Sequence, residues 1–337
     1  MAKGVILINL GTPDDPSTSS VRRYLKQFLL DPRVIDINPI ARHLLVRGII
    51  APFRAPKSAK GYQKLWTPQG SPLKHYGEVL AKGVQAHLGE DYVVELAMRY
   101  QSPSIQSALD KMMQRQVTEL IVLPLFPQYA SASTGSALEE VMRCMTTYNN
   151  VLPVKMIQSY PTNEVMLNVF ADNAKALLNE KKYDHILFSF HGLPQRQLRK
   201  GDLFNHCLKS ADCCQNLTPK NQFCYTAQCV ATAKGIAQLL DLKPSDYTVC
   251  YQSGLGKDPW TRPYTADVIK ERAEQGLKNM LVFSPAFVAD CLETLIEIRE
   301  EYQEEWEHLG GEKLQLVPSL NDNPKWIAEV AAMVRNY

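Results

Sequence analysis

Short apolar runs rich in β-branched residues alternate along the chain with longer stretches in which apolar residues recur every three or four positions. The apolar runs predict eight β-strands, at 4–10, 93–98, 119–125, 153–158, 185–190, 247–251, 279–284 and 314–317. The amphipathic stretches predict helices, for example at 104–115, 136–147, 164–180, 230–241, 265–275, 290–307 and 324–335. Apolar strands separated by helices indicate parallel sheets covered on both faces.

An internal repeat groups these strands into two halves. LINLGTP at 7–13 matches FSFHGLP at 188–194, and LIVLPLFP at 120–127 matches MLVFSPAF at 280–287. Between them, Tyr100-Gln101-Ser102 recurs as Tyr251-Gln252-Ser253, so the matches keep their order. The repeat predicts an α/β fold of two Rossmann-like lobes related by duplication, each a four-stranded parallel sheet flanked by helices. In such sheets, ligands bind at the carboxyl ends of the strands.

The predicted domains are an N-terminal lobe at 1–155, a C-terminal lobe at 156–322 and a final helix at 323–337. The first strand is not followed by G-x-G-x-x-G, and the chain contains no G-x-x-x-x-G-K-[ST] loop. We therefore expect no nucleotide cofactor.

The composition of the chain favours some classes of protein and argues against others. The 337 residues carry 37 Lys and Arg against 35 Asp and Glu, and 45% are hydrophobic. This balance is typical of a soluble globular protein and argues against a nucleic-acid binder. No run of 18 apolar residues predicts a membrane span, and the opening MAKGVILINLGTP is too short for a secretion signal. We expect a cytoplasmic protein, and a reducing compartment disfavours disulfides.

Five of the eight cysteines are concentrated in the segment HCLKSADCCQNLTPKNQFCYTAQC. Taking Cys214 as the second ligand, Cys207, Cys214, Cys224 and Cys229 give the spacing C-x6-C-x9-C-x4-C, with Cys213 as the alternative to Cys214. Four thiolates suit zinc or a [2Fe–2S] cluster. The lack of a C-x2-C pair, usual in zinc ribbons, favours iron–sulfur.

His191 ends an apolar strand just before a Gly-Leu-Pro turn, whereas the matching half has Leu10 at this place. The imidazole either bonds the turn or serves as a base or metal ligand at the ligand-binding edge. In FVADCLETLIEIREEYQEEWEHL, Asp290, Glu293 and Glu297 are three and four residues apart and would share one helical face. That face is either solvated or, opposite His191, a carboxylate path for a divalent metal and for protons.

A lip segment, residues 28–55, begins FLLDPRVIDINPIARHLLVRGIIAPF and combines apolar residues with prolines and arginines. It is either a pair of core helices or an apolar rim over a large flat ligand or a bilayer surface. In the second case Arg42, Arg47 and Arg54 would pair with carboxylates or lipid headgroups.

The motifs SFHGLP, DCLETLIEI, LINLGTP, MRYQSP, LPLFPQYASASTG and QSGLGKDPW resemble those of ferrochelatases, and the resemblance runs from residue 4 to about 330. It implies a lyase that inserts Fe²⁺ into protoporphyrin IX, forming protohaem and releasing two protons in the last step of haem biosynthesis. The alternatives are a chelatase for coproporphyrin or another tetrapyrrole, and a non-enzymatic iron–sulfur or haem-binding protein.

The resemblance also assigns roles. It implies that His191 and Glu293 form the metal site, and that Glu297 and Asp290 continue the acidic path. The porphyrin-binding residues that it implies are Arg54, Arg99, Tyr100 and Trp260. Some family members hold a [2Fe–2S] cluster, which here would be bound by the internal cysteines. The lip would be the porphyrin entrance and a peripheral contact with the inner face of the membrane. Many relatives have histidine where this chain has Cys291.

Overall fold

The computed structural model describes residues 2–254 and 258–337, and the chain forms two compact units. Unit 1 comprises the chain up to Phe126, residues Ala130–Ser159 and the C-terminal segment Asn321–Tyr337. Unit 2 comprises Pro127–Tyr129 and Tyr160–Leu320. The predicted lobes meet at 155/156, whereas unit 1 extends to Ser159 and also includes the C-terminal helix.

Each unit contains one four-stranded, all-parallel sheet. In unit 1 the strands are β1 (Lys3–Gly11), β2 (Tyr92–Tyr100), β3 (Leu120–Pro124) and β4 (Val154–Met156). In unit 2 they are β5 (His185–His191), β6 (Tyr247–Gln252), β7 (Asn279–Phe283) and β8 (Lys313–Leu316). The orders β2-β1-β3-β4 and β6-β5-β7-β8 are the same arrangement. The predicted strands and the two duplicated Rossmann-like lobes are confirmed.

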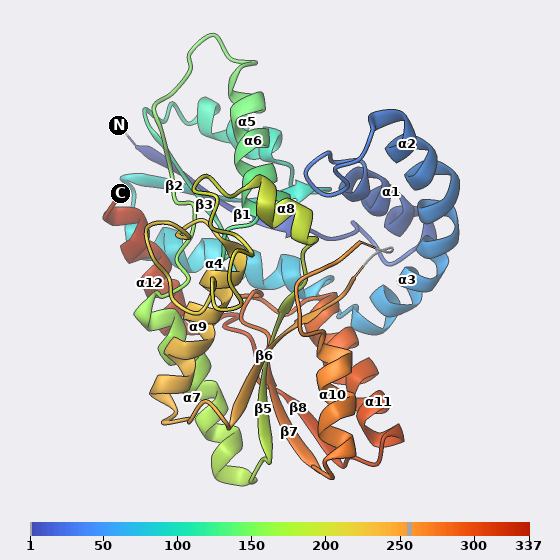
Figure 1. Ribbon diagram of the computed structural model, residues 1–337. Helices are drawn as coiled ribbons and strands as arrows, with labels where there is room; N and C mark the ends of the chain where they lie inside the picture. The colour runs from blue at the N-terminus through green and yellow to red at the C-terminus, as the bar shows by residue number, and fades with distance from the viewer. Residues whose placement is uncertain (1, 255–257) are drawn as a thin grey trace. The chain divides into compact units, whose positions relative to one another are not determined.

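Helices cover both faces of the sheet in unit 1. The helices of unit 1 are α1 (Thr18–Leu29), α2 (Pro39–Leu44), α3 (Ala51–Leu65), α4 (Pro72–Leu88), α5 (Ile105–Gln114), α6 (Ser136–Met145) and α12 (Pro324–Arg335), with π-helical segments at Leu45–Ile50 and Ser131–Gly135. Figure 1 shows α4 and α12 on one side of the sheet and α5 and α6 on the other. At Gly83 in α4, an added Cβ would lie 2.6 Å from Ile327, so this glycine permits the close approach of α12.

The helices of unit 2 are α7 (Glu164–Glu180), α8 (Gln195–Lys200), α9 (Tyr225–Leu239), α10 (Thr265–Glu274) and α11 (Gln303–His308), with a π-helical segment at Glu293–Tyr302. Figure 1 places α7 and α9 on one face of the sheet and α10 and α11 on the other. Leu187, Val282 and Trp306 belong to the core on the α10 and α11 side. Helix α9 begins five residues before the predicted start at 230, and the predicted helix 290–307 is π-helical over most of its length.

The lip segment forms α2, the π-helical turn and the start of α3, and it leaves large apolar side chains exposed. Ile40, Leu44, Ile49 and Phe53 are 72%, 69%, 58% and 77% exposed. Arg42 is buried and donates to the carbonyl of Ile35 at 3.2 Å, so the prediction that it pairs with headgroups is wrong.

Across residues 2–254 and 258–337, no helix combines the length and the apolar character needed to span a membrane.

Candidate active site

His191 is the last residue of β5, and its ring orientation follows from one hydrogen bond. Its Nδ1 lies 2.7 Å from the carbonyl oxygen of Gly192. A carbonyl oxygen only accepts, so Nδ1 carries the proton in the neutral imidazole. The lone pair is therefore on Nε2, where it is available for a proton or a metal ion.

The Gly-Leu-Pro turn that follows is paired with the segment containing Trp260. The backbone N–H of Thr261 donates to the carbonyl of Leu193 at 2.9 Å, and Gln195 Nε2 donates to the Trp260 carbonyl at 3.2 Å. The structure thus brings half-buried Trp260 beside the turn that carries His191. Residues 255–257 of the QSGLGKDPW motif lie outside the described residues.

Glu297 is held at the same edge of the sheet as His191. Its carboxylate accepts from the Ser253 hydroxyl at 3.0 and 3.1 Å. Ser253 directly follows Gln252, which is the register partner of His191 across β5 and β6. Both side chains therefore lie at the carboxyl end of the sheet, where parallel sheets bind ligands.

The acidic residues are not arranged as on the predicted α-helical face. Glu293 begins the π-helical segment, in which the hydrogen bonds run from residue i to i+5, so residues four and five apart share a side. Glu293 and Glu297 satisfy this spacing. Asp290 lies before the helix and accepts from the Thr294 hydroxyl at 3.2 Å, so its inclusion on a shared helical face is wrong.

Cys291 is buried beside Glu293. Burial raises the pKa of the thiol well above its usual range, and the nearby Glu293 carboxylate raises it further. The thiol therefore stays protonated and is within hydrogen-bonding reach of Glu293. A neutral donor thus takes the place at which a histidine was expected from the family resemblance.

In unit 1, three donors converge on one oxygen of Asp31. Asp31 Oδ2 accepts from Arg99 Nη2 at 2.8 Å, from the Tyr100 hydroxyl at 2.9 Å and from Ser136 Oγ at 2.5 Å. Tyr100 is fully buried, and burial raises the pKa of its hydroxyl far above the usual range. Tyr100 therefore holds the Asp31 carboxylate, which in turn holds Arg99. Arg54, the other predicted arginine of the porphyrin site, is exposed in the first turn of α3. Sequence reasoning missed Asp31, whose one signal is an acid inside the apolar run FLLDPRVI.

Cys207, Cys213 and Cys214 lie in the irregular segment between α8 and α9, Cys224 is the N-cap of α9, and Cys229 lies within that helix. All eight cysteines of the chain are free thiols. Cys213 Sγ lies 3.5 Å from Cys214 Sγ, which lies 3.9 Å from Cys224 Sγ. Burial raises the pKa of the Cys207 thiol to about 11, and the neighbouring Cys224 and Cys213 raise it further, which places Cys207 near this group. Cys229 is fully buried against Tyr225. Among the described residues, no group of three or more His, Cys, Asp or Glu side chains is already arranged to hold a metal ion.

Cys224 is the thiol best prepared to become a ligand. A hydrogen bond from Cys214 lowers its pKa below the usual range; burial opposes this shift, and the backbone N–H groups of Ala227 and Thr226 add to it. Those N–H groups belong to the first turn of α9, for which Cys224 is the cap, and a helix N-terminus favours an anion.

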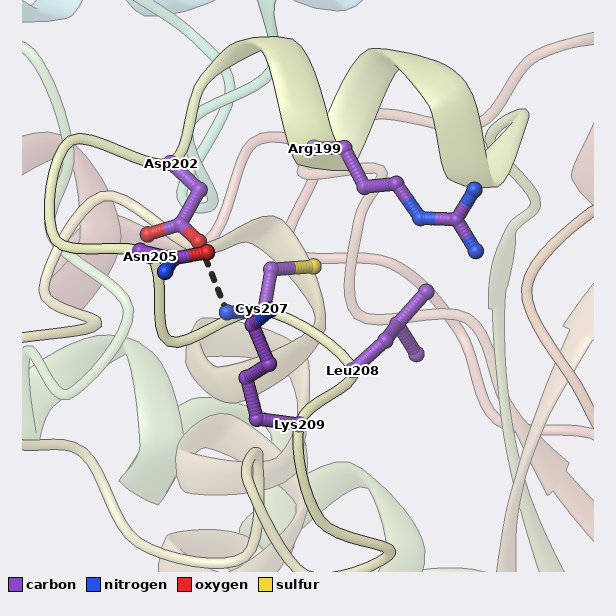
Figure 2. A pocket seen from close by; sticks show the side chains of 6 residues that line it. All are labelled: Arg199, Asp202, Asn205, Cys207, Leu208 and Lys209. Carbon is purple, nitrogen blue, oxygen red and sulfur yellow. Dashed lines mark hydrogen bonds between the residues drawn. The ribbon is translucent and has the colours of Figure 1, made fainter.

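Cys207 is held from the other side of the segment by Asp202. The carboxylate of Asp202 accepts from the Cys207 backbone N–H at 2.8 Å, as Figure 2 shows. Both residues line a recess of about 300 Å³ together with Arg199, Asn205, Leu208 and Lys209.

Comparison with known proteins identifies the family of this chain. The ferrochelatase family model matches residues 2–337. A ferrochelatase of Coxiella burnetii is 45% identical over 332 residues, covering 98% of this chain and 93% of its own. One from Legionella pneumophila is 41% identical over 335 residues and covers 99% of both chains.

Solved structures support the fold. The sirohydrochlorin chelatase SirB of Bacillus subtilis subspecies spizizenii, solved with cobalt, has a TM-score of 0.54 at 10% identity, covering 99% of this chain and 94% of its own. CbiX, an enzyme of sirohaem biosynthesis in denitrifying bacteria, has a TM-score of 0.52 at 11% identity, covering 99% and 98%. These similarities show a two-lobed chelatase fold. With the near-complete sequence match, they establish that this chain belongs to the ferrochelatase family.

Proposed function

We propose that this protein is a lyase that inserts Fe²⁺ into protoporphyrin IX, giving protohaem and two protons. One observation carries the proposal. His191, whose Nε2 keeps its lone pair, and Glu297, whose carboxylate is held by Ser253, lie at the same edge of one sheet. The ferrochelatase family supports the choice of iron and porphyrin as substrates.

The chemistry requires two pyrrole protons to leave while the ring nitrogens bind the metal. His191 accepts protons through Nε2, because its Nδ1 is already occupied by the Gly192 carbonyl. Glu293 and Glu297 supply hard oxygen atoms that replace water on the substrate iron or pass protons onward. Trp260 presses on the macrocycle and bends it, which exposes the nitrogen lone pairs.

Four residues are proposed to bind the porphyrin: Arg54, Arg99, Tyr100 and Trp260. Exposed Arg54 pairs with a propionate, and Trp260 contacts the ring. Tyr100 acts indirectly, because its hydroxyl is engaged with Asp31 and helps to fix Arg99. The exposed apolar side chains of the lip favour protoporphyrin over the more highly carboxylated coproporphyrin.

A [2Fe–2S] cluster is proposed for the cysteine segment, with Cys207, Cys214, Cys224 and Cys229 as ligands and Cys213 as the alternative to Cys214. Two thiolates about 2.3 Å from one tetrahedral metal are about 3.8 Å apart. The 3.9 Å between the sulfur atoms of Cys214 and Cys224 therefore fits ligation of one metal, and Cys213, 3.5 Å from Cys214, is close enough to take its place.

A second observation supports the cluster. The buried hydroxyl of Tyr251 has no hydrogen-bond partner among residues 2–254 and 258–337, and it lies within electrostatic reach of three of the clustered thiols. When bound, the cluster would cross-link the segment and absorb visible light. Cys224→Ser should abolish the chromophore and Cys144→Ser should preserve it. An unchanged spectrum in Cys224→Ser would remove Cys224 from the ligand set.

We also propose that the protein is cytoplasmic and touches the inner face of a membrane through the lip. The support is the set of exposed apolar side chains Ile40, Leu44, Ile49 and Phe53 on consecutive turns. Exposed Arg47 and Arg54 would contact anionic headgroups beside them.

The test of the function is anaerobic mixing of the protein with protoporphyrin IX and Fe²⁺. Conversion of the four-band free-base spectrum to two bands, faster than with His191→Ala, is the expected result. Coproporphyrin is assayed in parallel to decide the preferred ring. Porphyrin binding without conversion of either ring would identify a carrier instead.

A further inference from the structure

Tyr225 makes a contact to the backbone of His191 that the reaction scheme above does not use. The Tyr225 hydroxyl donates to the carbonyl oxygen of His191 at 2.8 Å. Tyr225 is 6% exposed, so little water competes for this hydrogen bond. A neutral, rigid phenol buried at the end of β5 is suited to fixing geometry.

The peptide group between His191 and Gly192 is held by a hydrogen bond on each side. On one side, the N–H of Gly192 donates to the carbonyl of Gln252 in β6 at 2.7 Å. On the other, the carbonyl of His191 accepts from Tyr225 in α9. This peptide fixes the backbone from which the imidazole extends and the position of the Gly192 Cα, next to the carbonyl that holds Nδ1.

Tyr225 also connects His191 to the cysteine segment. It is the first residue of α9, directly after Cys224, and Cys229 lies one turn further along the helix with its thiol against the Tyr225 hydroxyl. Residues one helical turn apart are neighbours on the helix surface. Any shift of the first turn of α9 therefore moves the hydroxyl that holds the His191 carbonyl.

We infer that Tyr225 is a positioning residue: it sets the tautomer and direction of the His191 imidazole, and it makes both depend on the cysteine-capped start of α9. The inference rests on the proposed role of His191 in metallation. Tyr225 itself touches no substrate, and it acts through the backbone of its neighbour.

The test is Tyr225→Phe, which removes one hydroxyl and keeps the ring. Tyr247→Phe is the matched control, since Tyr247 packs on Phe188 at the opposite end of the same sheet. We expect kcat to fall about five-fold, as for the loss of one hydrogen bond, with little change in the KM for porphyrin. Tyr247→Phe should leave both unchanged.

A second readout is independent of activity. Selective ¹⁵N labelling of the seven histidines, with His191→Ala for assignment, reports the tautomer of His191 by NMR. Wild type should show the Nδ1–H form, and Tyr225→Phe should show a mixture. If kcat and the His191 signals of Tyr225→Phe both stay at wild-type values, the inference is overturned. If the tautomer changes but wild type metallates no porphyrin, the positioning stands and the proposed function fails.

The dependence on the cysteines is tested by combining Tyr225→Phe with Cys224→Ser. If the helix start acts through Tyr225, the two losses of kcat should be less than multiplicative, because they interrupt one chain of contacts. Fully multiplicative losses would remove the link to the cysteines and leave Tyr225 as a local support of His191.

Discussion

Asp31→Asn is expected to destabilise unit 1 by about 3 kcal/mol, the lower end of the cost of breaking a buried ion pair. The Asp31 side chain is 3% exposed and its partner Arg99 is 16% exposed, so water replaces little of the lost interaction. The amide cannot satisfy the site in either orientation. In one orientation the amide nitrogen, itself a donor, replaces Oδ2 and faces the three donors there. In the other it replaces Oδ1 and faces the backbone N–H of Arg33, which donates to Oδ1 at 2.7 Å.

Urea denaturation followed by tryptophan fluorescence measures this cost, because Trp326 is fully buried in the same unit. Asp15→Asn is the matched control. Its pair with Arg23 is about half exposed at 4.0 Å, and such surface pairs contribute less than about 1 kcal/mol.

A double variant separates the causes. One candidate cause of the cost of Asp31→Asn is that the Arg99 guanidinium stays buried without its carboxylate. In that case the double variant Asp31→Asn, Arg99→Met should lose less free energy of unfolding than the two single variants lose together. A loss below about 1 kcal/mol in Asp31→Asn would refute the view that this carboxylate holds the unit together.

Three further changes test the site and the lip. His191→Ala should lower kcat by about 10²–10⁴-fold, the usual contribution of a general base, while porphyrin binding measured by fluorescence quenching is retained; near-normal turnover would remove His191 from the chemistry. Ser253→Ala should lower kcat about tenfold, since hydrogen bonds to a carboxylate such as Glu297 contribute about 1.5–3 kcal/mol, and exposed Ser245→Ala should not. Phe53→Ser should weaken flotation with anionic liposomes by about 2 kcal/mol, with neutral liposomes as the control; unchanged flotation would exclude the lip as the contact.

The strands of both sheets were predictable from the sequence because they are apolar on both faces. All eight strands lie within two residues of their predicted bounds, and the repeat correctly implied that both sheets share one order. These features depend on local composition and on burial, which the sequence records directly.

Other features depend on contacts that leave no periodic signal. Helix α9 starts at Tyr225, after the N-cap Cys224, and the polar residues Thr226 and Gln228 in its first turn interrupt the apolar pattern, which begins only at Val230. The π-helical winding at Glu293–Tyr302 was not predictable, because an apolar spacing of three and four residues does not distinguish it from an α-helix. Asp31 and Tyr225 act through partners distant in sequence, which one chain alone does not identify.

Comparison of the two halves separates what the fold requires from what the chemistry requires. Glycines occupy matching places in the two halves: Gly11 ends β1, and Gly192 directly follows β5. A Cβ on Gly11 would lie 2.0 Å from the Tyr100 carbonyl oxygen, and one on Gly192 would lie 3.0 Å from that of Gln252. The neighbouring strand therefore excludes a side chain at Gly11 and would crowd one at Gly192, so packing favours glycine at both places.

The residue before that glycine has no such constraint. It is Leu10 in unit 1 and His191 in unit 2, at the same place of the same strand order. Since leucine serves the fold equally well there, packing does not explain the histidine. Its Nδ1 is satisfied by the next carbonyl, its own carbonyl is held by a buried tyrosine, and its Nε2 keeps its lone pair. These local contacts fix the ring without occupying the reactive nitrogen, as a general base requires.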